Sequence, residues 1–329
     1  MKIKRTLDKI PGGMMVVPLL LAATINTFFP NALRIGGFTE ALFVNSSSAL
    51  IALFLLIAGT QITLKSAGSS IKKGTTLLII KWLIGAAVGL IAIFLADDET
   101  GLFLGLAPIA IIAAMTNSNG GLYVALVGQY GKEDDKAAYP ILALNDGPFL
   151  TMVALAIFGA MGFTNGLFSP VSFIAVLVPV LVGVVIGNLD HEMGAWLQKG
   201  GDMLVPFFAF SLGMGIDFSA IIEGGLGGIA LGVLTVLLTG GISYFVFKAF
   251  GWNPIVGAAE GSTAGNAVGT PAAIAAANAA FAPVAEIATV QVAASVVTTA
   301  ILLPIFIGFL VKRLEKSGGV AKYNEPKVQ

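Results

Sequence analysis

Long apolar segments follow one another along almost the whole of this 329-residue chain. A helix needs about 20 consecutive, mostly apolar residues to cross the hydrocarbon core of a membrane. Ten segments meet this requirement, at residues 12–29, 42–63, 71–96, 101–130, 137–161, 170–188, 200–217, 222–249, 254–281 and 284–311. The sequence therefore predicts an all-α membrane protein with ten transmembrane helices.

The composition excludes several classes of protein. Charged residues make up only 11% of the chain, whereas a soluble domain has about 25%. The formal net charge is zero, and the chain has one histidine and no cysteine. We therefore expect no nucleic-acid partner, no disulfide, no cofactor and no resident metal centre. The sequence also lacks the Gly-Lys-Ser/Thr signature of a phosphate-binding loop, which argues against an ATP-driven pump.

The lysines and arginines are distributed unevenly among the predicted loops. If the N-terminus is cytoplasmic, nearly all of them fall on the cytoplasmic side, Arg34 is in an outer loop, and Lys81 lies within the third span. Cytoplasmic loops of membrane proteins carry an excess of basic residues. We therefore predict a multi-pass protein of the bacterial inner membrane with both termini in the cytoplasm, including a tail at residues 314–329.

The two halves of the chain resemble each other. Three pairs of segments match in the same order: 17–26 with 178–187, 58–64 with 212–218, and 116–119 with 263–266. We therefore predict a first five-helix repeat at residues 1–165 and a second at residues 166–313. Because five is odd, the second repeat lies upside down relative to the first. Such inverted repeats are common in secondary transporters.

Polar, glycine-rich segments interrupt the fourth and ninth predicted spans at matching positions, 116–121 and 260–266. Non-helical backbone at membrane depth is tolerated where it is buried in protein or lines a cavity. The N–H groups that start a half-helix attract anions, and the carbonyls that end one attract cations. We expect Asn119 and Thr270 to cap the second half-helices. Ordinary packing kinks are the alternative.

These breaks define the candidate site of a transporter. The candidate substrate-binding residues are Asn117, Ser118, Asn119, Gly120, Asn145, Thr263, Asn266, Thr270 and Gln291. The candidate ion-coupling residues are Asp146, Glu260, Thr116 and Ser262. Asp146 and Glu260 are carboxylates at membrane depth, where ionisable residues are costly and usually functional. The alternatives are satisfied structural carboxyls for these two residues and a helix–helix hydrogen bond for Gln291.

Three other features have simpler interpretations. We expect Lys81 to extend along the third span to the cytoplasmic surface, and the alternatives are that it neutralises Asp146 or meets a substrate carboxylate. We expect His191 and the charged run 132–136 to lie in solvated loops.

Several motifs resemble those of one family, the bacterial 2-keto-3-deoxygluconate permeases. They are Ile10-Pro11-Gly12-Gly13, Val17-Pro18-Leu19-Leu20, Asn119-Gly120-Gly121-Leu122-Tyr123, Gly187-Asn188-Leu189-Asp190-His191, Pro206-Phe207-Phe208 and Val292-Ala293-Ala294-Ser295-Val296. The resemblance covers nearly the whole chain. It implies uptake of 2-keto-3-deoxygluconate, a pectin breakdown product, together with protons.

The resemblance further implies a fold similar to that of the bile acid:sodium symporters. In that fold a panel of spans 1, 2, 6 and 7 lies beside a core of spans 3, 4, 5, 8, 9 and 10, and the broken spans 4 and 9 cross. Sodium-coupled relatives use an acidic residue at the ninth-span break, where this chain has Glu260. A sodium-coupled organic-anion symporter, with Glu260 as a metal ligand, is therefore the alternative.

The predicted function is a secondary active transporter that imports a sugar-acid anion with a proton, or with sodium, by alternating access. A channel would need a continuous lined pore, and no filter-like repeats occur in the sequence. An intramembrane enzyme would need a nucleophile beside a base or a metal pair, and a chain with one histidine and no cysteine offers few such residues.

Overall fold

The computed structural model describes residues 2–7, 9, 13–60, 68–97, 102–136, 138–145, 147–164, 170–216, 218–315, 319 and 321–324. Across these residues the regular structure is helical, apart from one isolated bridge between Phe103 and Leu106. The prediction of an all-α protein is therefore confirmed for this part of the chain.

The helices follow the predicted spans closely. In chain order they are α1 (Ile3–Leu7), α2 (Gly13–Phe28), α3 (Gly37–Phe43), α4 (Ser47–Thr60), α5 (Gly68–Leu95), α6 (Pro108–Thr116), α7 (Gly120–Tyr130), α8 (Glu133–Lys136), α9 (Tyr139–Leu142), η1 (Ala143–Asn145), α10 (Phe149–Ala160), α11 (Pro170–Leu189), α12 (His191–Gly213), α13 (Phe218–Thr235), η2 (Val236–Gly240), α14 (Gly241–Ala249), α15 (Pro254–Ala258), η3 (Gly265–Gly269), α16 (Thr270–Ala277), η4 (Ala279–Phe281), α17 (Ala282–Glu315) and α18 (Ala321–Asn324). Each of the ten predicted spans overlaps at least one of them.

Length and apolarity single out some of these helices as membrane spans. Three stretches in the described part are long and apolar enough to cross a membrane alone: Ile71–Leu95, Gly224–Ala249 and Ala279–Glu315. The number rises to five if each of two bent helix pairs, α3 with α4 and α6 with α7, is taken as one span. Shorter apolar helices occur in α2, α10, α11 and α12.

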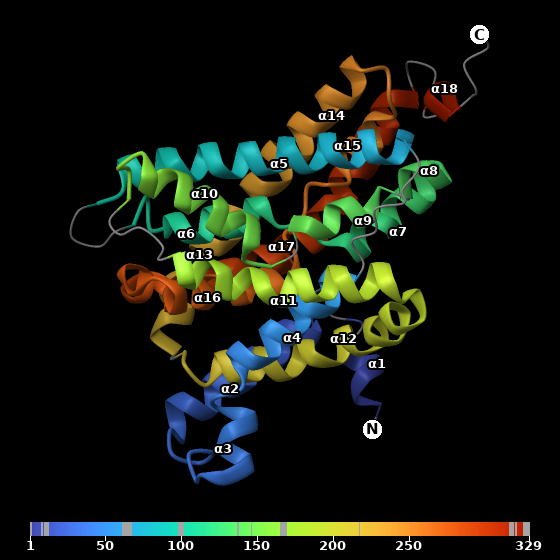
Figure 1. Ribbon diagram of the computed structural model, residues 1–329. Coiled ribbons are helices and arrows are strands. Elements are labelled where there is room, and N and C mark those ends of the chain that lie inside the picture. The colour runs from blue at the N-terminus through green and yellow to red at the C-terminus, as the bar shows by residue number, and fades with distance from the viewer. Residues whose placement is uncertain are drawn as a thin grey trace.

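The helices form two groups. In the panel group, α4 packs along α11 and α2 packs along α12. In the core group, α5 packs against α6, α13 against α17, and α14 against α15. Figure 1 shows α2, α4 and α12 in the lower half of the molecule and α5, α14 and α15 in the upper half.

Two glycines allow the panel helices to approach closely. A Cβ atom at Gly59 in α4 would lie 2.3 Å from the backbone oxygen of Val180 in α11, and one at Gly213 in α12 would lie 2.2 Å from that of Leu19 in α2. Only glycine fits at such contacts, as in other closely packed membrane helices. Gly59 matches Gly213, and Leu19 matches Val180, when the two halves of the sequence are aligned. The equivalent close contact therefore occurs in both helix pairs, α4 with α11 and α2 with α12.

The first halves of the two interrupted spans are enclosed by protein. All residues of α6 and all residues of α15 are buried. A helix that is apolar on every side is found in the interior. The backbone breaks that follow α6 and α15 are therefore within the core group, where non-helical backbone is tolerated.

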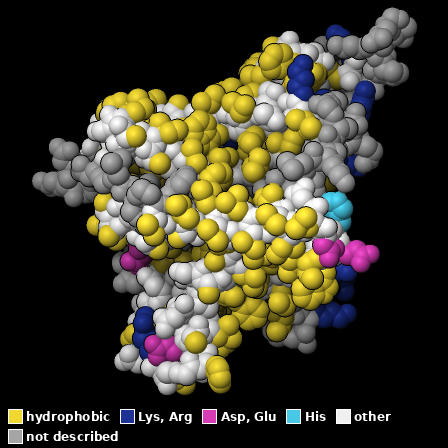
Figure 2. Space-filling model, viewed as in Figure 1, with side chains coloured by type: hydrophobic (Ala, Val, Ile, Leu, Met, Phe, Trp, Pro, Cys, Tyr) yellow, Lys and Arg dark blue, Asp and Glu magenta, His cyan; other side chains and the backbone are white. Residues whose placement is uncertain are grey.

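The surface of the molecule is apolar. Large side chains such as Leu83, Leu181 and Leu226 are more than half exposed, at 52%, 55% and 79%. Figure 2 shows hydrophobic side chains over much of the visible face, with acidic and basic groups near its edges. A soluble monomer rarely exposes apolar patches on this scale. Contact with lipid explains the surface, so the chain is a multi-pass membrane protein.

Three irregularities were not predicted. The α3 and α4 axes meet at a bend of 56° within the second predicted span. The fifth predicted span is divided between η1 and α10, where Gly147 has a positive φ of 82° and Pro148 lacks an N–H donor. The eighth contains the π-helix η2. Polar or helix-breaking residues stand at all three positions, in segments 45–48, 145–148 and 239–241, so the sequence carried a signal that the predicted continuous spans did not use.

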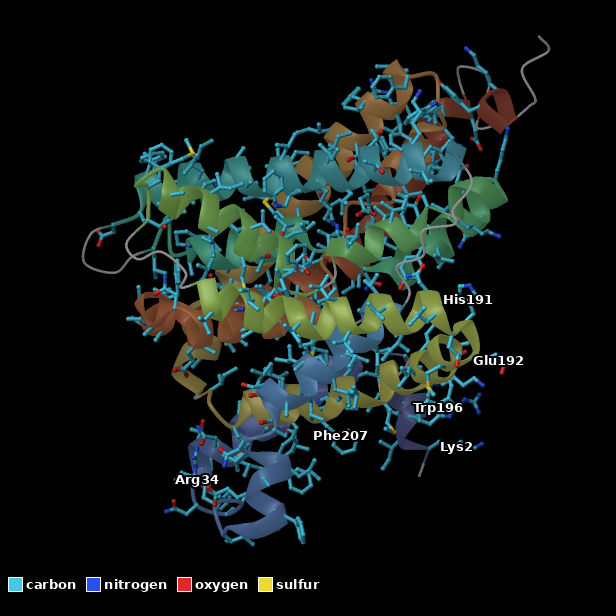
Figure 3. The ribbon with its side chains drawn as sticks, in the orientation of Figure 1. Lys2, Arg34, His191, Glu192, Trp196 and Phe207 are labelled. Carbon is cyan, nitrogen blue, oxygen red and sulfur yellow. The ribbon has the colours of Figure 1, made fainter. Side chains whose placement is uncertain are left out.

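The two ends of the molecule carry different groups. Figure 3 shows Lys2, His191 and Glu192 toward one end, on the right, and Arg34 toward the other. Helices α1 and α18 also lie on the right in Figure 1. His191 is the exposed first residue of α12, and the Asp190 side chain caps that helix by accepting a hydrogen bond from the N–H of Met193 at 3.0 Å.

Candidate functional site

The two predicted breaks meet inside the core group. Helices α6 and α7 are related by a bend of 41° at residues 117–119. The backbone N–H of Asn119 donates to the Ser262 hydroxyl at 3.1 Å, and the Thr263 hydroxyl donates to the carbonyl of Ala114 at 3.2 Å. These bonds join the break that follows α6 directly to the break that follows α15.

One of the two predicted helix caps is confirmed and the other is wrong. The Asn119 side chain caps α7 by accepting a hydrogen bond from the N–H of Leu122 at 3.0 Å. Thr270, however, is the first residue of α16, and the cap position belongs to Gly269. The 3₁₀-helix η3 runs directly into α16, so residue 270 is already helical and is not a cap.

Glu260 lies fully buried at the crossing, with an exposed fraction of 0%. Its Oε1 atom accepts a hydrogen bond from the Ser118 hydroxyl. That hydroxyl in turn accepts a hydrogen bond from Nδ2 of Asn145 at 2.7 Å. The other oxygen, Oε2, has no hydrogen-bond partner among the described residues. The carboxyl group is therefore bonded through Oε1, and the Asn145 amide also interacts with it directly.

Lys81 of α5 points into the same crossing. Its exposed fraction is 0%, and its ammonium group donates to the carbonyls of Glu260 and Ser262 at 2.7 and 2.5 Å. It also interacts electrostatically with the Glu260 side chain. The expectation that Lys81 extends to the cytoplasmic surface is wrong, because the carbonyls of the ninth-span break hold its ammonium group in the interior.

Hydroxyl pairs brace each break against the span that follows it. The Thr116 and Thr151 hydroxyls are 2.9 Å apart, and those of Thr263 and Ser295 are 2.8 Å apart. Thr116 also donates to the carbonyl of Ile112. Thr116 and Thr263 match in the aligned halves of the sequence. Through these contacts, Thr116 and Thr263 position the two breaks.

Three other candidate residues keep unpaired polar atoms near the breaks. Oδ1 of Asn117, Oδ1 of Asn266 and the Thr270 hydroxyl are buried and have no hydrogen-bond partner among the described residues. Buried polar atoms are normally paired. A polar ligand with hydroxyl groups is suited to such atoms. Gly120 follows Asn119 as the first residue of α7, and it packs closely against Tyr139, because a Cβ atom there would lie 1.9 Å from the Tyr139 ring.

The structure places Gln291 apart from this cluster. Its amide donates to the carbonyl of Gly105 at 2.7 Å and accepts from the N–H of Ala107 at 2.9 Å. Both partners precede α6, whose length separates them from the break by about 14 Å at the rise of an α-helix. Gln291 therefore bonds to the non-helical segment that leads into α6, and this contact is not the helix–helix hydrogen bond of its alternative interpretation. Asp146 lies outside the described residues.

Two cavities lie at the boundary between the panel and core groups. One, of about 410 Å³, is lined by residues that include Arg34, Asn45, Ser211 and Glu286. The other, of about 250 Å³, lies between α4, α11 and α16. Ser47 and Ala272 line both. Ligand pockets typically have about 300 to 1,000 Å³, so the first is large enough for a small molecule.

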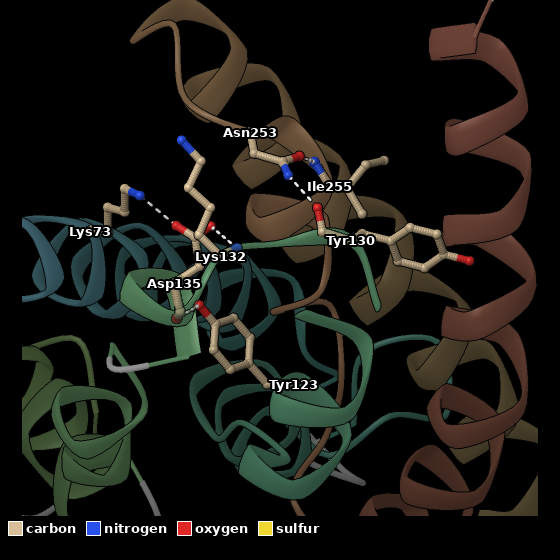
Figure 4. Close-up of polar contacts among 7 residues, drawn as sticks. All are labelled: Lys73, Tyr123, Tyr130, Lys132, Asp135, Asn253 and Ile255. Atoms are coloured by element: carbon tan, nitrogen blue, oxygen red, sulfur yellow. Dashed lines mark hydrogen bonds and ion pairs between the residues drawn. The ribbon is translucent and has the colours of Figure 1, made fainter. Parts of the chain in front are cut away.

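We expected the charged run 132–136 to be a solvated loop, and this prediction is wrong. Asp135 is 2% exposed, forms an ion pair with Lys73 at 2.5 Å, and accepts a hydrogen bond from the N–H of Lys132 at 2.8 Å. The Tyr123 hydroxyl donates to the backbone carbonyl of Asp135 at 3.0 Å. Figure 4 shows Asp135 between these partners.

Asn253 makes a second connection at this end of the core group. Its side chain caps α15 by accepting a hydrogen bond from the N–H of Ile255, and it donates to the carbonyl of Tyr130 at 2.7 Å (Figure 4). It thereby joins the end of α7 to the start of α15. The dipeptide Asn253-Pro254 is a usual signal of a helix start. The capping role of Asn253 could therefore have been predicted from the sequence.

Broken, buried helices that meet around a carboxyl and an ammonium group, together with cavities at the boundary of two helix groups, are features of a membrane transport protein. The family model described as 2-keto-3-deoxygluconate permease matches residues 4–316. The chain belongs to this family, and it is therefore a permease and not an enzyme.

Three relatives illustrate the similarity. The chain is 49% identical to 2-keto-3-deoxygluconate permease 1 of Salmonella typhimurium, over 98% of this chain and 99% of the relative. It is 41% identical to the 2-keto-3-deoxygluconate permease of Pectobacterium carotovorum, over 95% and 98%. It is 40% identical to that of Bacillus subtilis, over 96% of both chains.

Proposed function

We propose that this protein imports 2-keto-3-deoxygluconate by proton symport and alternating access. The names of the relatives support the substrate. The observation that carries the coupling is the buried Glu260 carboxyl group, whose Oε2 has no hydrogen-bond partner among the described residues. A proton can bind at that oxygen without breaking the bond that Ser118 makes to Oε1.

The charge of the substrate explains the need for coupling. A sugar acid is an anion at neutral pH, and a negative-inside potential opposes its uptake. Moving one elementary charge costs about 2.3 kcal/mol per 100 mV. At least one cation must therefore accompany each anion to offset this term. Glu260 is one carrier in this proposal, and Asp146 is a second.

In the proposed substrate site, the carboxylate binds N–H groups at the starts of α7 and η3. The start of α16 is not available, because the Thr270 N–H already donates to the carbonyl of Ala267 and Pro271 has no N–H. The hydroxyl groups of the sugar acid bind polar atoms around the breaks. Asn117, Asn145, Asn266 and Thr270 supply these atoms, each with a buried oxygen that has no partner among the described residues. Asn119 and Gly120 supply the capped start of α7.

The proposed architecture has ten crossings in two inverted repeats, 1–165 and 166–313, with both termini and the tail 314–329 cytoplasmic. The matching contacts of Gly59 with Val180 and of Gly213 with Leu19 support the repeat. The position of α1 and α18 on the same side of Figure 1 supports an even number of crossings. This orientation places Arg34 and the two cavities on the outside of the inner membrane.

Alternating access then consists of movement between the panel and core groups. The cavities at their boundary on the Arg34 side support a state that is open to the outside. In the opposite state, the core group presents the crossing to the cytoplasm.

Uptake of labelled 2-keto-3-deoxygluconate into proteoliposomes tests the proposal. An inward proton gradient without sodium should drive accumulation, and a protonophore should abolish it. Uptake that requires sodium at constant pH would instead establish the sodium-coupled organic-anion symporter. That alternative is favoured by one observation, because a carboxyl oxygen without a partner beside backbone carbonyls also suits a metal cation. Failure to accumulate or exchange this sugar acid under either gradient would overturn the proposed substrate.

A further inference from the structure

The carbonyls that end the first half of the ninth span already hold a cation, which is the ammonium group of Lys81. The two acceptors, the carbonyls of Glu260 and Ser262, belong to the non-helical segment between α15 and η3. Carbonyls at such an end attract cations, and in other transporters unwound carbonyls coordinate the coupling ion. Two of the three ammonium donors of Lys81 are directed at this pair.

The packing of α5 fixes this position of Lys81. Leu77, Lys81 and Gly85 recur every four residues and therefore share one face of the helix. A Cβ atom at Gly85 would lie 2.9 Å from the backbone carbon of Met115, so this face is in close contact with the end of α6. Leu77, one turn before Lys81, is 0% exposed. The α5 face is thus set against the crossing, and the lysine stem brings its charge to the break.

An ammonium group and a sodium ion cannot share these carbonyls. Both would lie within bonding distance of the same two oxygens, and like charges so close repel strongly at the low effective dielectric of a protein interior. A metal ion would bind only if Lys81 moved away or lost its proton. Lys81 also supplies the opposite charge that a buried Glu260 carboxylate requires.

We infer that Lys81 is the residue that determines ion specificity in this permease, because its ammonium group takes the place of a sodium ion at the ninth-span break. This inference rests on the proposed function and concerns the same site. The coupling step then involves only a proton, which is bound and released at Glu260 Oε2.

Among the described residues, two other ionisable groups are linked to the pair, on α7 and α8. Tyr123 of α7 interacts electrostatically with Glu260 and with Asp135 of α8. Asp146, adjacent in sequence to Asn145, lies outside the described residues. None of these groups contributes a further positive charge, so Lys81 is the cation of this cluster among the residues described.

The test compares the melting temperature of the purified full-length protein in sodium chloride and in choline chloride at equal pH and ionic strength. The proteins are wild type, Lys81→Ala, Lys81→Gln and Lys72→Ala. Lys72 is an exposed residue of the same helix and provides the matched control. Wild type and Lys72→Ala should melt at the same temperature in both salts. Each folded Lys81 variant should melt several degrees higher in sodium chloride, because the vacated carbonyls and the Glu260 carboxylate then bind the metal ion.

A sodium-dependent rise in the melting temperature of the wild type would overturn the inference, and this arm requires no variant to fold. A folded Lys81→Ala or Lys81→Gln protein without any response to sodium would also overturn it. The melting experiment uses no sugar acid. A wild type that binds neither sodium nor 2-keto-3-deoxygluconate would therefore contradict the proposed substrate and leave the ion specificity supported.

Discussion

Asn119 and Ser262 join the two interrupted spans through one hydrogen bond, from the backbone N–H of Asn119 to the Ser262 hydroxyl at 3.1 Å. Each residue has a second role. The Asn119 side chain caps α7, and the Ser262 carbonyl accepts a hydrogen bond from Lys81. The start of α7 and the Lys81 ammonium group at the break after α15 are thus held at fixed positions relative to each other. A change at either break is therefore expected to affect both anion binding and ion coupling.

Removing the charge of Glu260 should uncouple transport. Glu260→Gln keeps the size of the side chain and an oxygen for the Ser118 hydroxyl but cannot exchange a proton. We expect gradient-driven accumulation to be lost while exchange of internal for external substrate continues. Uptake and counterflow in proteoliposomes measure the two activities, and Glu192→Gln, at an exposed position in α12, is the control. The same pattern is expected for Asp146→Asn. If both Glu260→Gln and Asp146→Asn still concentrate the substrate, neither residue is the coupling site.

Ser118→Ala should destabilise the protein. The hydroxyl connects Asn145 with Glu260, and its loss leaves buried polar atoms on both without that partner. Leaving a buried group unsatisfied costs about 1–3 kcal/mol. A lower melting temperature is the expected result, and Ser118→Thr, which retains a hydroxyl group, should be less affected. Equal melting temperatures for Ser118→Ala and wild type would contradict the hydrogen-bond chain.

Asn119→Ala and Asn266→Ala should both weaken substrate binding but should differ in stability. Asn119→Ala removes a helix cap, which costs about 0.5–2 kcal/mol, whereas Asn119→Asp retains it. Oδ1 of Asn266 has no partner among the described residues, so its loss removes no described bond at that atom. Calorimetry with 2-keto-3-deoxygluconate and thermal melts separate the two effects. Unchanged affinity in both alanine variants would place the substrate elsewhere.

Gly59→Ala and Gly213→Ala should each force the panel helices apart. The added methyl group would overlap the carbonyl of Val180 or of Leu19. Overpacking of this kind typically costs about 1–3 kcal/mol. Gly200→Ala is the control, because a Cβ atom at that α12 position meets nothing within 4 Å. Thermal melts should rank both variants below Gly200→Ala, and a clear effect at only one glycine would argue against the proposed repeat.

The orientation can be tested by cysteine labelling, because the natural chain contains no cysteine. Arg34 and His191 are both exposed and lie toward opposite ends of the molecule in Figure 3. A membrane-impermeant maleimide added to intact spheroplasts should label Arg34→Cys and spare His191→Cys, while both should react in permeabilised cells. The reverse pattern would invert the proposed topology.

The features that the sequence predicted correctly depend on local chemistry. A long apolar run specifies a helix, a polar glycine-rich run interrupts it, and an asparagine at the start of a half-helix caps it. Thr116–Asn119 and Glu260–Asn266 were recognisable as breaks because polar residues are conspicuous among apolar ones.

The features that the sequence could not predict depend on contacts between distant residues. Helix α5 is apolar around most of its circumference, so its pattern cannot show which side faces lipid and which faces protein. For this reason the predicted direction of the Lys81 side chain was wrong. The burial of Asp135 depends on Lys73, which is 62 residues away. The side chain of Gln291 meets residues 105 and 107, which are farther away still.

The space shared by Ser47 and Ala272 has a consequence for inhibition. Both boundary cavities meet there, between helices that must slide past one another if the panel and core groups exchange positions. A small apolar molecule lodged in this space would act as a wedge and arrest the transporter without competing for the sugar-acid site. Such a compound would lower the maximal rate of uptake and leave the apparent affinity for the substrate unchanged.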